Sequence, residues 1–238
     1  MRMNQQGSTL IIVLVVLLLI TIIGTIAVKS SILNLKISTN AQIDALLLES
    51  NDAALFALED QTKVSRQLAQ DGMFGYFNSA DSNDELVFCY RANAKNFFSM
   101  SNASVISANG NFTKNGVSGF CKAKEYSTRR AAVQTQLYLR KNVKPTTPLT
   151  TLPIGTSVGQ SGLPVISNHI AVTAISILPS FSSASDDEIQ NCFKQTSIKK
   201  SDTTETVREC FERLSIPYNL QNAEYMVGGQ PKLRHRRT

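Results

Sequence analysis

Four cysteines are the residues of this 238-residue chain whose spacing most restricts their chemistry. They are Cys89, Cys121, Cys192 and Cys210, and no two of them form a C-x-x-C pair. Because the chain holds only two histidines, a zinc site would have few ligands. Two disulfides fit better, and among the connectivities we choose the nearest neighbours, Cys89 with Cys121 and Cys192 with Cys210. Disulfides indicate an oxidising compartment, whereas four reduced, buried cysteines are the alternative.

A reactive serine is the other chemistry that a short motif could supply. Residues 155–159 satisfy G-x-S-x-G around Ser157, a pattern that exposes a nucleophile between a strand and a helix. A stretch rich in Thr and Pro precedes the motif, and Gly162 and Pro164 follow it, so neither element can frame the serine here. We also expect His169 to lie in a strand instead of serving as the base of a triad.

A second serine motif is weaker still. Ser197 and Lys200 satisfy S-x-x-K, but the chain lacks the partner motifs of that class, and we interpret the segment as a solvated turn. The glycine patterns of P-loops and dinucleotide sites are also absent from the sequence. We therefore expect a protein that is not an enzyme and that carries no cofactor and no metal.

The elements that position these residues begin with a long uncharged run. Only 18% of the residues are charged, against roughly 25% in an ordinary soluble domain, and no ionisable side chain occurs between Arg2 and Lys29. Residues 10–28 read LIIVLVVLLLITIIGTIAV, close to the ~20 residues that span a bilayer. The run exceeds the apolar stretch of about 7 to 15 residues in a secretory signal, and no Ala-x-Ala follows it. We therefore expect a retained transmembrane helix.

Helix-compatible residues continue beyond this run without proline or glycine as far as Asp71, and Gly72 supplies a stop. Glu59 and Lys63 have the spacing of a helical ion pair. The pattern predicts one helix over residues 8–70, the first part in a membrane and the second packed on a domain. The apolar positions at helical spacing are Ile43, Leu46, Leu47, Ala54, Ala57, Leu58 and Leu68.

Strand signals dominate the middle of the chain. We expect strands over residues 85–90, 131–139 and 170–178, from short apolar runs and from alternation of apolar and polar residues. A loop rich in Thr, Gly and Pro, residues 145–164, separates the second strand from the third. The simplest architecture is α+β, with a long N-terminal helix packed on an antiparallel sheet.

After residue 180 the pattern becomes helical. Asp202 followed by Glu205 makes a cap-like start for a helix over residues 203–214, which Pro217 ends. The third and fourth cysteines would tie this segment together. We therefore expect a C-terminal helical extension that is held by a disulfide.

The leader before the apolar run narrows the class of protein. It is short and polar, carries Arg2, ends in Gly7, and is followed at Ser8 by the uncharged run. This pattern resembles type IV pilins, whose prepilin peptidase cuts after a glycine placed before the hydrophobic segment. The resemblance implies cleavage between Gly7 and Ser8 and N-methylation of the new Ser8 amine. A chance glycine before a plain membrane anchor with a helical stalk is the alternative.

One position departs from the pattern of major pilins. They carry a glutamate at the fifth mature position, where it is thought to pair with the N-terminal amine of a neighbouring subunit, and here that position is Ile12. A carboxylate in an apolar fibre core is costly unless it is paired. A subunit without it therefore fits best at the tip, with nothing above it. The pattern is similar to the PilX minor pilins over residues 1–60, and the K-type pseudopilin of type II secretion shares the missing glutamate.

These signals divide the chain into four parts. Residues 1–7 form a prepilin leader, 8–28 a transmembrane helix, 29–71 its periplasmic continuation, and 72–238 a globular pilin body with a basic tail. The tail ends KLRHRRT, and the body holds most of the basic residues. Such patches attract nucleic acid or anionic surfaces, but we favour the alternative of a solvated face with a disordered tail.

The resemblance implies a function in assembly. We expect a minor pilin that helps to initiate type IV pilus assembly, at the fibre tip, with other minor pilins, the major pilin and the prepilin peptidase as partners. We expect a single pass of the inner membrane as a precursor, with the body in the periplasm, and then a place in the pilus fibre at the surface of a Gram-negative bacterium. The alternatives are a minor pseudopilin of type II secretion and a bitopic periplasmic binding or sensor protein, which needs no cleavage at Gly7.

Overall fold

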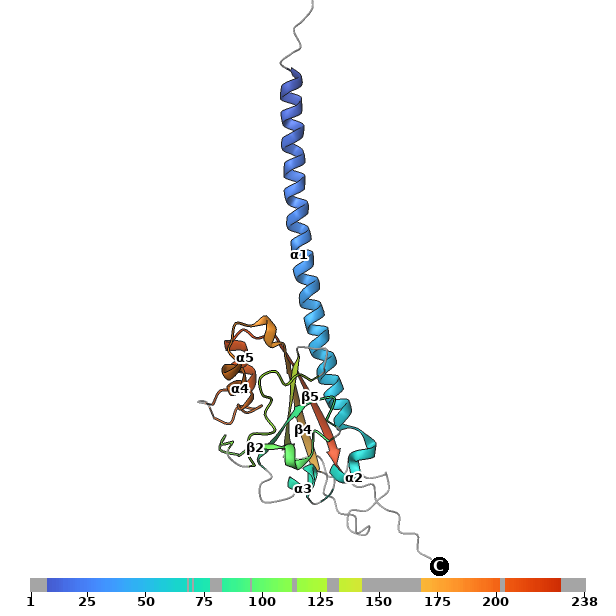
Figure 1. Ribbon diagram of the computed structural model, residues 1–238, viewed down its shortest axis with the longest axis vertical. Helices are drawn as coiled ribbons and strands as arrows, with labels where there is room; N and C mark the ends of the chain where they lie inside the picture. Colours follow the sequence, from blue (N-terminus) through green and yellow to red (C-terminus); the bar gives the residue numbers. More distant parts are fainter. Residues whose placement is uncertain are drawn as a thin grey trace, which may run out of the picture. The chain divides into compact units, whose positions relative to one another are not determined.

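A long helix, α1 (Ser8–Leu58), opens the part of the chain that the computed structural model describes (Figure 1). The described residues are 8–67, 69, 71–77, 83–94, 96–112, 115–127, 133–142, 168–201 and 204–227. The chain forms two units, the first ending at Ala45 and the second beginning at Leu46. Because this boundary falls within α1, residues 46–58 of the helix belong to the folded body.

The prediction that one helix continues to residue 70 is wrong, because α1 ends at Leu58. The Asp60 side chain accepts hydrogen bonds from the backbone N–H and the hydroxyl of Thr62, at 3.0 and 2.7 Å, and this local bonding favours a turn. The buried Gln67 side chain donates to the Leu58 carbonyl oxygen at 2.9 Å. It thereby satisfies an acceptor that the helix end leaves open.

The predicted ion pair between Glu59 and Lys63 does not form, because it required helical spacing. The Lys63 ammonium instead lies 3.0 Å from the Asp60 carboxylate, and Glu59 accepts a hydrogen bond from the Tyr225 hydroxyl at 2.6 Å. Three short helical segments come next in the chain, and they are η1 (Gln61–Lys63), α2 (Val64–Gln67) and α3 (Met73–Tyr76).

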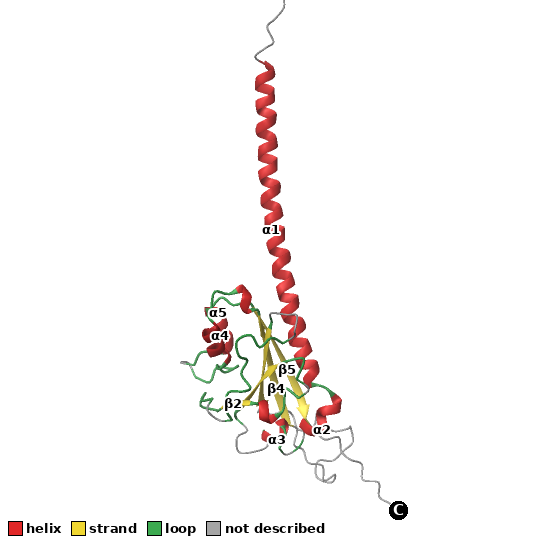
Figure 2. Cartoon of the chain, in the orientation of Figure 1, coloured by secondary structure: helices red, strands yellow, loops and turns green. Residues whose placement is uncertain are grey.

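Among the described residues, five antiparallel strands form one sheet in the order β2-β1-β3-β4-β5. Figure 2 draws the strands in yellow. The three predicted strands are confirmed as β1, β3 and β4, whereas β2 and β5 were not predicted. The predicted loop over residues 145–164 lies outside the described residues. The strands are β1 (Glu85–Tyr90), β2 (Ser104–Ile106), β3 (Gln134–Asn142), β4 (Asn168–Ile177) and β5 (Tyr218–Val227), and single turns η2 (Met100–Asn102) and η3 (Pro179–Phe181) lie in the connections.

Two short helices, α4 (Asp186–Phe193) and α5 (Val207–Arg213), lie between β4 and β5 in the sequence. Each begins with a capping box, in which a Ser or Thr hydroxyl and a Glu carboxylate satisfy each other's backbone N–H groups. The predicted start of α5 is wrong by several residues, because the cap is Thr206 with Glu209 and not the pair at 202 and 205. The chain returns to the sheet after α5, so the disulfide-tied helices are followed by a strand.

Both faces of the sheet are covered at β1, which explains why this strand is buried at every position. One face packs on α1, and its cluster includes Ala54, Leu58, Leu86, Phe88 and Leu137. The opposite face packs on α4 and α5, and its cluster includes Val87, Tyr138, Ile175, Phe193 and Phe211. The predicted α+β class is therefore confirmed, with a helix on one face and a helical pair on the other.

The structure contains two disulfides, which join the nearest-neighbour cysteines. Cys89 of β1 is joined to Cys121 with a Cα–Cα distance of 4.9 Å, and Cys192 of α4 is joined to Cys210 of α5 at 5.4 Å. All four cysteines are paired. The second disulfide links the two short helices directly, so it holds the helical pair together as one packed element.

Candidate assembly interface

The first part of α1 is apolar on every side. Between Leu10 and Val28 the large apolar side chains each expose 47% to 72% of their surface. A helix that is hydrophobic all round needs an apolar environment on every side, either lipid or other helices. This segment is therefore the largest candidate interface among the described residues.

Two hydroxyl groups interrupt the apolar segment, and both are satisfied within the helix. Thr21 donates to the Leu18 carbonyl oxygen and Thr25 to that of Ile22, each at 2.8 Å. Internal bonding of this kind removes the need for water or for a polar partner in an apolar medium. Within Leu10–Leu58, α1 is long and apolar enough to cross a membrane. The segment thus fits either a bilayer or a bundle of similar helices.

The residues predicted to be processed lie at the beginning of α1. Gly7 falls outside the described residues, and Ser8 is the first residue of the helix. Ile12 exposes 59% of its surface, and the first turn of α1 carries no acidic side chain. The helix start therefore offers no carboxylate of its own. Cleavage after Gly7 and methylation of Ser8 stay predictions.

A buried polar cluster fixes residues 46–58 of α1 against the sheet. The Ser50 hydroxyl bonds to that of Thr135 in β3 at 2.7 Å, and Asn51 accepts from the Ser176 hydroxyl in β4 at 2.7 Å. Asn51 also donates to the Asn219 carbonyl oxygen in β5 at 3.0 Å. Because these groups are buried, other registers of the helix would leave them unsatisfied. The signal in the sequence was the uncharged polar pair Ser50 and Asn51 inside the polar run of residues 49–52, and it was missed.

The interpretation of Ser197 as part of a solvated turn is wrong. Its hydroxyl donates to the Glu85 carboxylate and its backbone N–H donates to the same carboxylate at 3.1 Å. Glu85 is 2% exposed, and burial raises the pKa of its carboxyl despite the nearby Ser197, Lys200 and Arg140. Lys200 donates to the Ser107 carbonyl oxygen at 2.5 Å, and desolvation lowers its pKa. These contacts tie the segment after α4 to β1 and to the residue after β2.

The other serine motif cannot be placed. Ser157 lies outside the described residues. His169 belongs to β4, so its predicted place in a strand is confirmed. Among the described residues, no group of three or more His, Cys, Asp or Glu side chains is placed to hold a metal ion.

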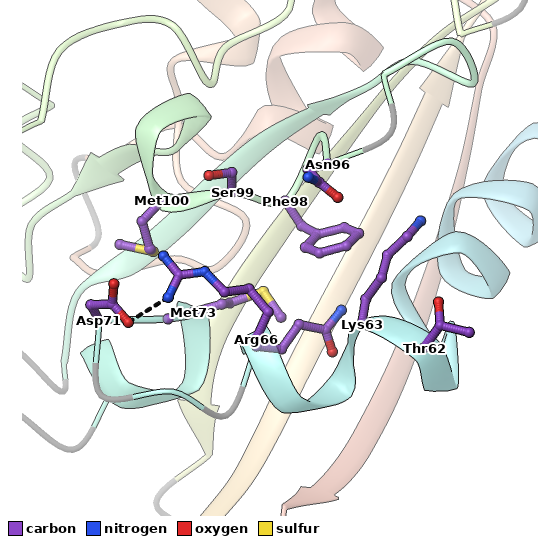
Figure 3. A pocket seen from close by; sticks show the side chains of 11 residues that line it. Thr62, Lys63, Arg66, Asp71, Met73, Asn96, Phe98, Ser99 and Met100 are labelled. Atoms are coloured by element: carbon purple, nitrogen blue, oxygen red, sulfur yellow. Dashed lines mark hydrogen bonds and ion pairs between the residues drawn. The ribbon is translucent and has the colours of Figure 1, made fainter.

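A small cleft of about 190 Å³ lies beside α2 and α3 (Figure 3). The Lys63 ammonium sits 5.4 Å from the centre of the Phe98 ring, and Arg66 pairs with Asp71 at 2.6 Å. Met73 and Met100 also line it. The cleft combines apolar surface with cations, of which Arg66 is already paired, and its described lining holds no cysteine or histidine that could act as a nucleophile or base.

Comparison with known proteins gives one family. Residues 6–56 match the model of the family described as PilX N-terminal. Residues 6–56 are therefore similar to this family, and we call them the PilX N-terminal segment. The match confirms the resemblance to PilX-type pilins, and it supports a pilin of the type IV pilus that is anchored by an apolar helix. No curated protein and no solved structure matches the chain significantly.

The PilX N-terminal segment ends two residues before α1 does. It therefore includes the apolar run, Ile12 and the polar residues Ser50 and Asn51. The sheet and the helical pair lie outside the match. Conclusions about these elements therefore depend on their own geometry.

Proposed function

We propose that this chain is a minor pilin that helps to initiate type IV pilus assembly from the tip of the fibre. The observation that carries the proposal is the apolar helix of the PilX N-terminal segment, which is exposed on all sides and has Ile12 where major pilins have a glutamate. In this proposal residues 1–7 are a leader removed after Gly7, and residues 8–28 span the inner membrane of a Gram-negative cell until assembly. The body lies in the periplasm, where the disulfides can form.

Packing is the proposed mechanism of assembly. When the helix leaves lipid for a bundle of equally apolar helices, it exchanges one apolar environment for another, so the free energy of its apolar surface changes little. Association then depends on close van der Waals contacts and on the body that the helix carries. The internal bonds of Thr21 and Thr25 suit both environments, because neither hydroxyl needs an external partner.

The proposed position depends on charge. The new amine of a subunit above this chain would find Ile12 and no carboxylate, and an unpaired charge in an apolar core is expensive. A subunit at the tip has no neighbour above it and avoids this cost. Contacts with other minor pilins would then precede the addition of the major pilin.

Deletion of the gene tests the proposal by counting fibres. We expect far fewer pili per cell with the major pilin unchanged in the remaining ones, because initiation is lost but elongation is not. Immunogold labelling of sheared pili should mark one end. Labelling along the shaft at the abundance of a major pilin would refute the tip position, and a defect in type II secretion with normal pili would favour a pseudopilin.

Substitution at Ile12 tests the charge argument. Ile12→Glu restores a carboxylate at the fifth mature position, and we expect some of the label to move into the shaft. Ile12→Leu is the matched control and should keep the label at the end. Equal labelling patterns for both variants would contradict the argument that residue 12 determines the position of the subunit in the fibre.

A further inference from the structure

A polar groove of about 660 Å³ lies beside α5, on the sheet face that α4 and α5 only partly cover. The strand register places Glu85, Arg140, Ala171 and Glu224 in one row across β1, β3, β4 and β5. Toward the helices, the same face of β4 carries the large apolar Ile175 and Ile177, which pack with α4 and α5. The small or polar residues of β4, Ala171 and Thr173, form part of the groove lining instead.

Arg140 lacks a hydrogen-bond partner for its Nε among the described residues of this groove. Its partner across the strands is Glu85, but that carboxylate is held by Ser197. The Arg140 Nε is buried and makes no hydrogen bond. A buried donor without an acceptor is costly, so the described chain satisfies the Arg140 guanidinium only in part.

The other charges of the groove are already engaged. Arg208 pairs with Glu212 at 2.8 Å, and Glu209 lies 3.7 Å from Lys199, which is outside the groove lining. Glu224 is likewise engaged. Arg140 is therefore the charge of this lining that lacks a partner, and a carboxylate is the acceptor that suits a guanidinium best, because it can accept parallel hydrogen bonds from two guanidinium nitrogens.

The lining favours a peptide as the source of that carboxylate. None of the described residues that line the groove is aromatic, so a base would find no ring on which to stack. Glu209 and Glu212 in the lining would repel nucleic acid, which carries a negative charge at every nucleotide, more than a peptide segment with a single carboxylate. The volume lies within the range of about 300 to 1,000 Å³ typical of binding pockets.

We propose that this groove binds an acidic peptide segment of a neighbouring pilus subunit, with its Asp or Glu carboxylate on Arg140. The proposal rests on the proposed function for the identity of the neighbour, but not for the chemistry of the groove. It gives the body a contact of its own, separate from the helix bundle that α1 enters.

Photo-crosslinking in piliated cells tests the proposal with the full chain. Ile198, at the rim and 38% exposed, is replaced by a photoreactive phenylalanine, and linked peptides are identified by mass spectrometry. We expect a peptide of another pilus subunit that contains Asp or Glu. Arg140→Gln should lower the yield about tenfold, the loss of one charged hydrogen-bonded contact. Arg66→Gln removes the same charge outside the groove and should leave the yield unchanged.

The outcomes separate this inference from the proposed function. An acidic peptide from a protein outside the pilus would uphold the groove and contradict the pilin function. Linkage to this chain's own residues 143–167 or 228–238, to lipid or to glycan would overturn the inference. A yield that Arg140→Gln does not change would also overturn it.

A second variant guards against loss of folding. Asn222 lines the groove, and its side-chain oxygen accepts from the Thr173 hydroxyl at 2.8 Å, a bond that Asn222→Asp can keep. The added negative charge should compete with the ligand.

Purified full-length protein in detergent is titrated with a fluorescent pentapeptide, acetyl-Gly-Ser-Glu-Ser-Gly, and with its Gln analogue. We expect the Glu peptide to bind about tenfold more tightly than the Gln analogue, and both Asn222→Asp and Arg140→Gln to remove the difference. Equal binding of the two peptides by the unsubstituted protein would contradict the proposal.

Discussion

At the scale of single residues, buried polar side chains decide how the elements of the body are joined. Asn51 uses both ends of its amide, one toward Ser176 of β4 and the other toward Asn219 of β5. Its own surface is fully buried. Removing it would leave an acceptor and a donor buried without partners, which costs more than the loss of an average hydrogen bond.

Asn51→Ala should therefore lower the free energy of unfolding by about 1 to 3 kcal/mol. Asp52→Ala is the control next in sequence, because Asp52 is exposed and accepts one bond from Gln221 at 2.9 Å. It should cost no more than about 0.5 kcal/mol. Chemical denaturation of the processed protein in detergent measures both. Equal losses for the two variants would contradict the role of the buried cluster.

Glu85 makes stability depend on pH with an unusual sign. Because burial raises the pKa of its carboxyl in the folded state, the folded protein holds this proton more tightly than the unfolded chain does. The contribution of Glu85 to stability is thus largest below the unfolded pKa of 4.5 and falls as the pH rises toward the folded pKa. Glu85→Gln removes the titration, so the unfolding free energy of wild type minus that of the variant should fall as the pH rises from 4.5.

Glu188 supplies the control of opposite sign. Hydrogen bonds from the backbone and side chain of Ser185 lower the pKa of its carboxyl. Its contribution is present above the unfolded pKa of 4.5 and is lost as the pH falls through the folded pKa. The unfolding free energy of wild type minus that of Glu188→Gln should therefore increase as the pH rises. Denaturation curves at a series of pH values measure both variants, and the same slope for both would contradict the assignment.

At the scale of elements, local sequence patterns predicted the strands that depend mainly on the preferences of their own residues. β1, β3 and β4 were predicted because apolar and β-branched residues are grouped there with short polar interruptions. β5 was missed because Asn219, Gln221 and Asn222 look like turn residues. In the fold Asn219 and Gln221 bond to polar groups of α1, and Asn222 faces the groove. The end of α1 was missed for a similar reason, since its capping side chain, Gln67, comes nine residues later.

The candidate interface and the groove also differ in how far the sequence could predict them. The apolar run, Ile12 and the leader are continuous in sequence and could be recognised there. Arg140 and its groove could not, because they depend on the pairing of four strands and on Ser197 drawing Glu85 away. Only the folded chain brings these residues together.

The disulfide between α4 and α5 should govern the stability of that helical pair. Its half-cystines are 18 residues apart, and the chain-entropy estimate for a loop of this size is roughly 3 kcal/mol. Cys192→Ser with Cys210→Ser should therefore increase hydrogen exchange in α4 and α5 before it affects β3. Removal of the Cys89–Cys121 bond is the matched control and should act first on β1. Exchange that rises equally across the body in both variants would argue against a separate helical unit.

At the scale of the whole molecule, one chain must serve two environments. The apolar part of α1 requires lipid or neighbouring helices, whereas the body carries disulfides, capped helices and a polar groove that suit an aqueous, oxidising compartment. In the proposed function, removal of the leader allows the chain to pass from the membrane into the fibre. The leader ends next to the first residue of α1, so cleavage there would leave the helix intact with a new amine at its start.

This processing step gives the final prediction. Gly7→Val should leave an uncut precursor in the inner membrane, because the peptidase of the resembled family cuts after glycine. Gly24→Val is the matched control, since Gly24 has open space around it in the described structure and lies within the helix, away from the cleavage point. Intact-mass measurement should find methylated Ser8 as the first residue in wild type and in the control, and Met1 in Gly7→Val. A wild-type chain that keeps Met1 in a peptidase-competent cell would refute the pilin proposal and favour a plain membrane anchor.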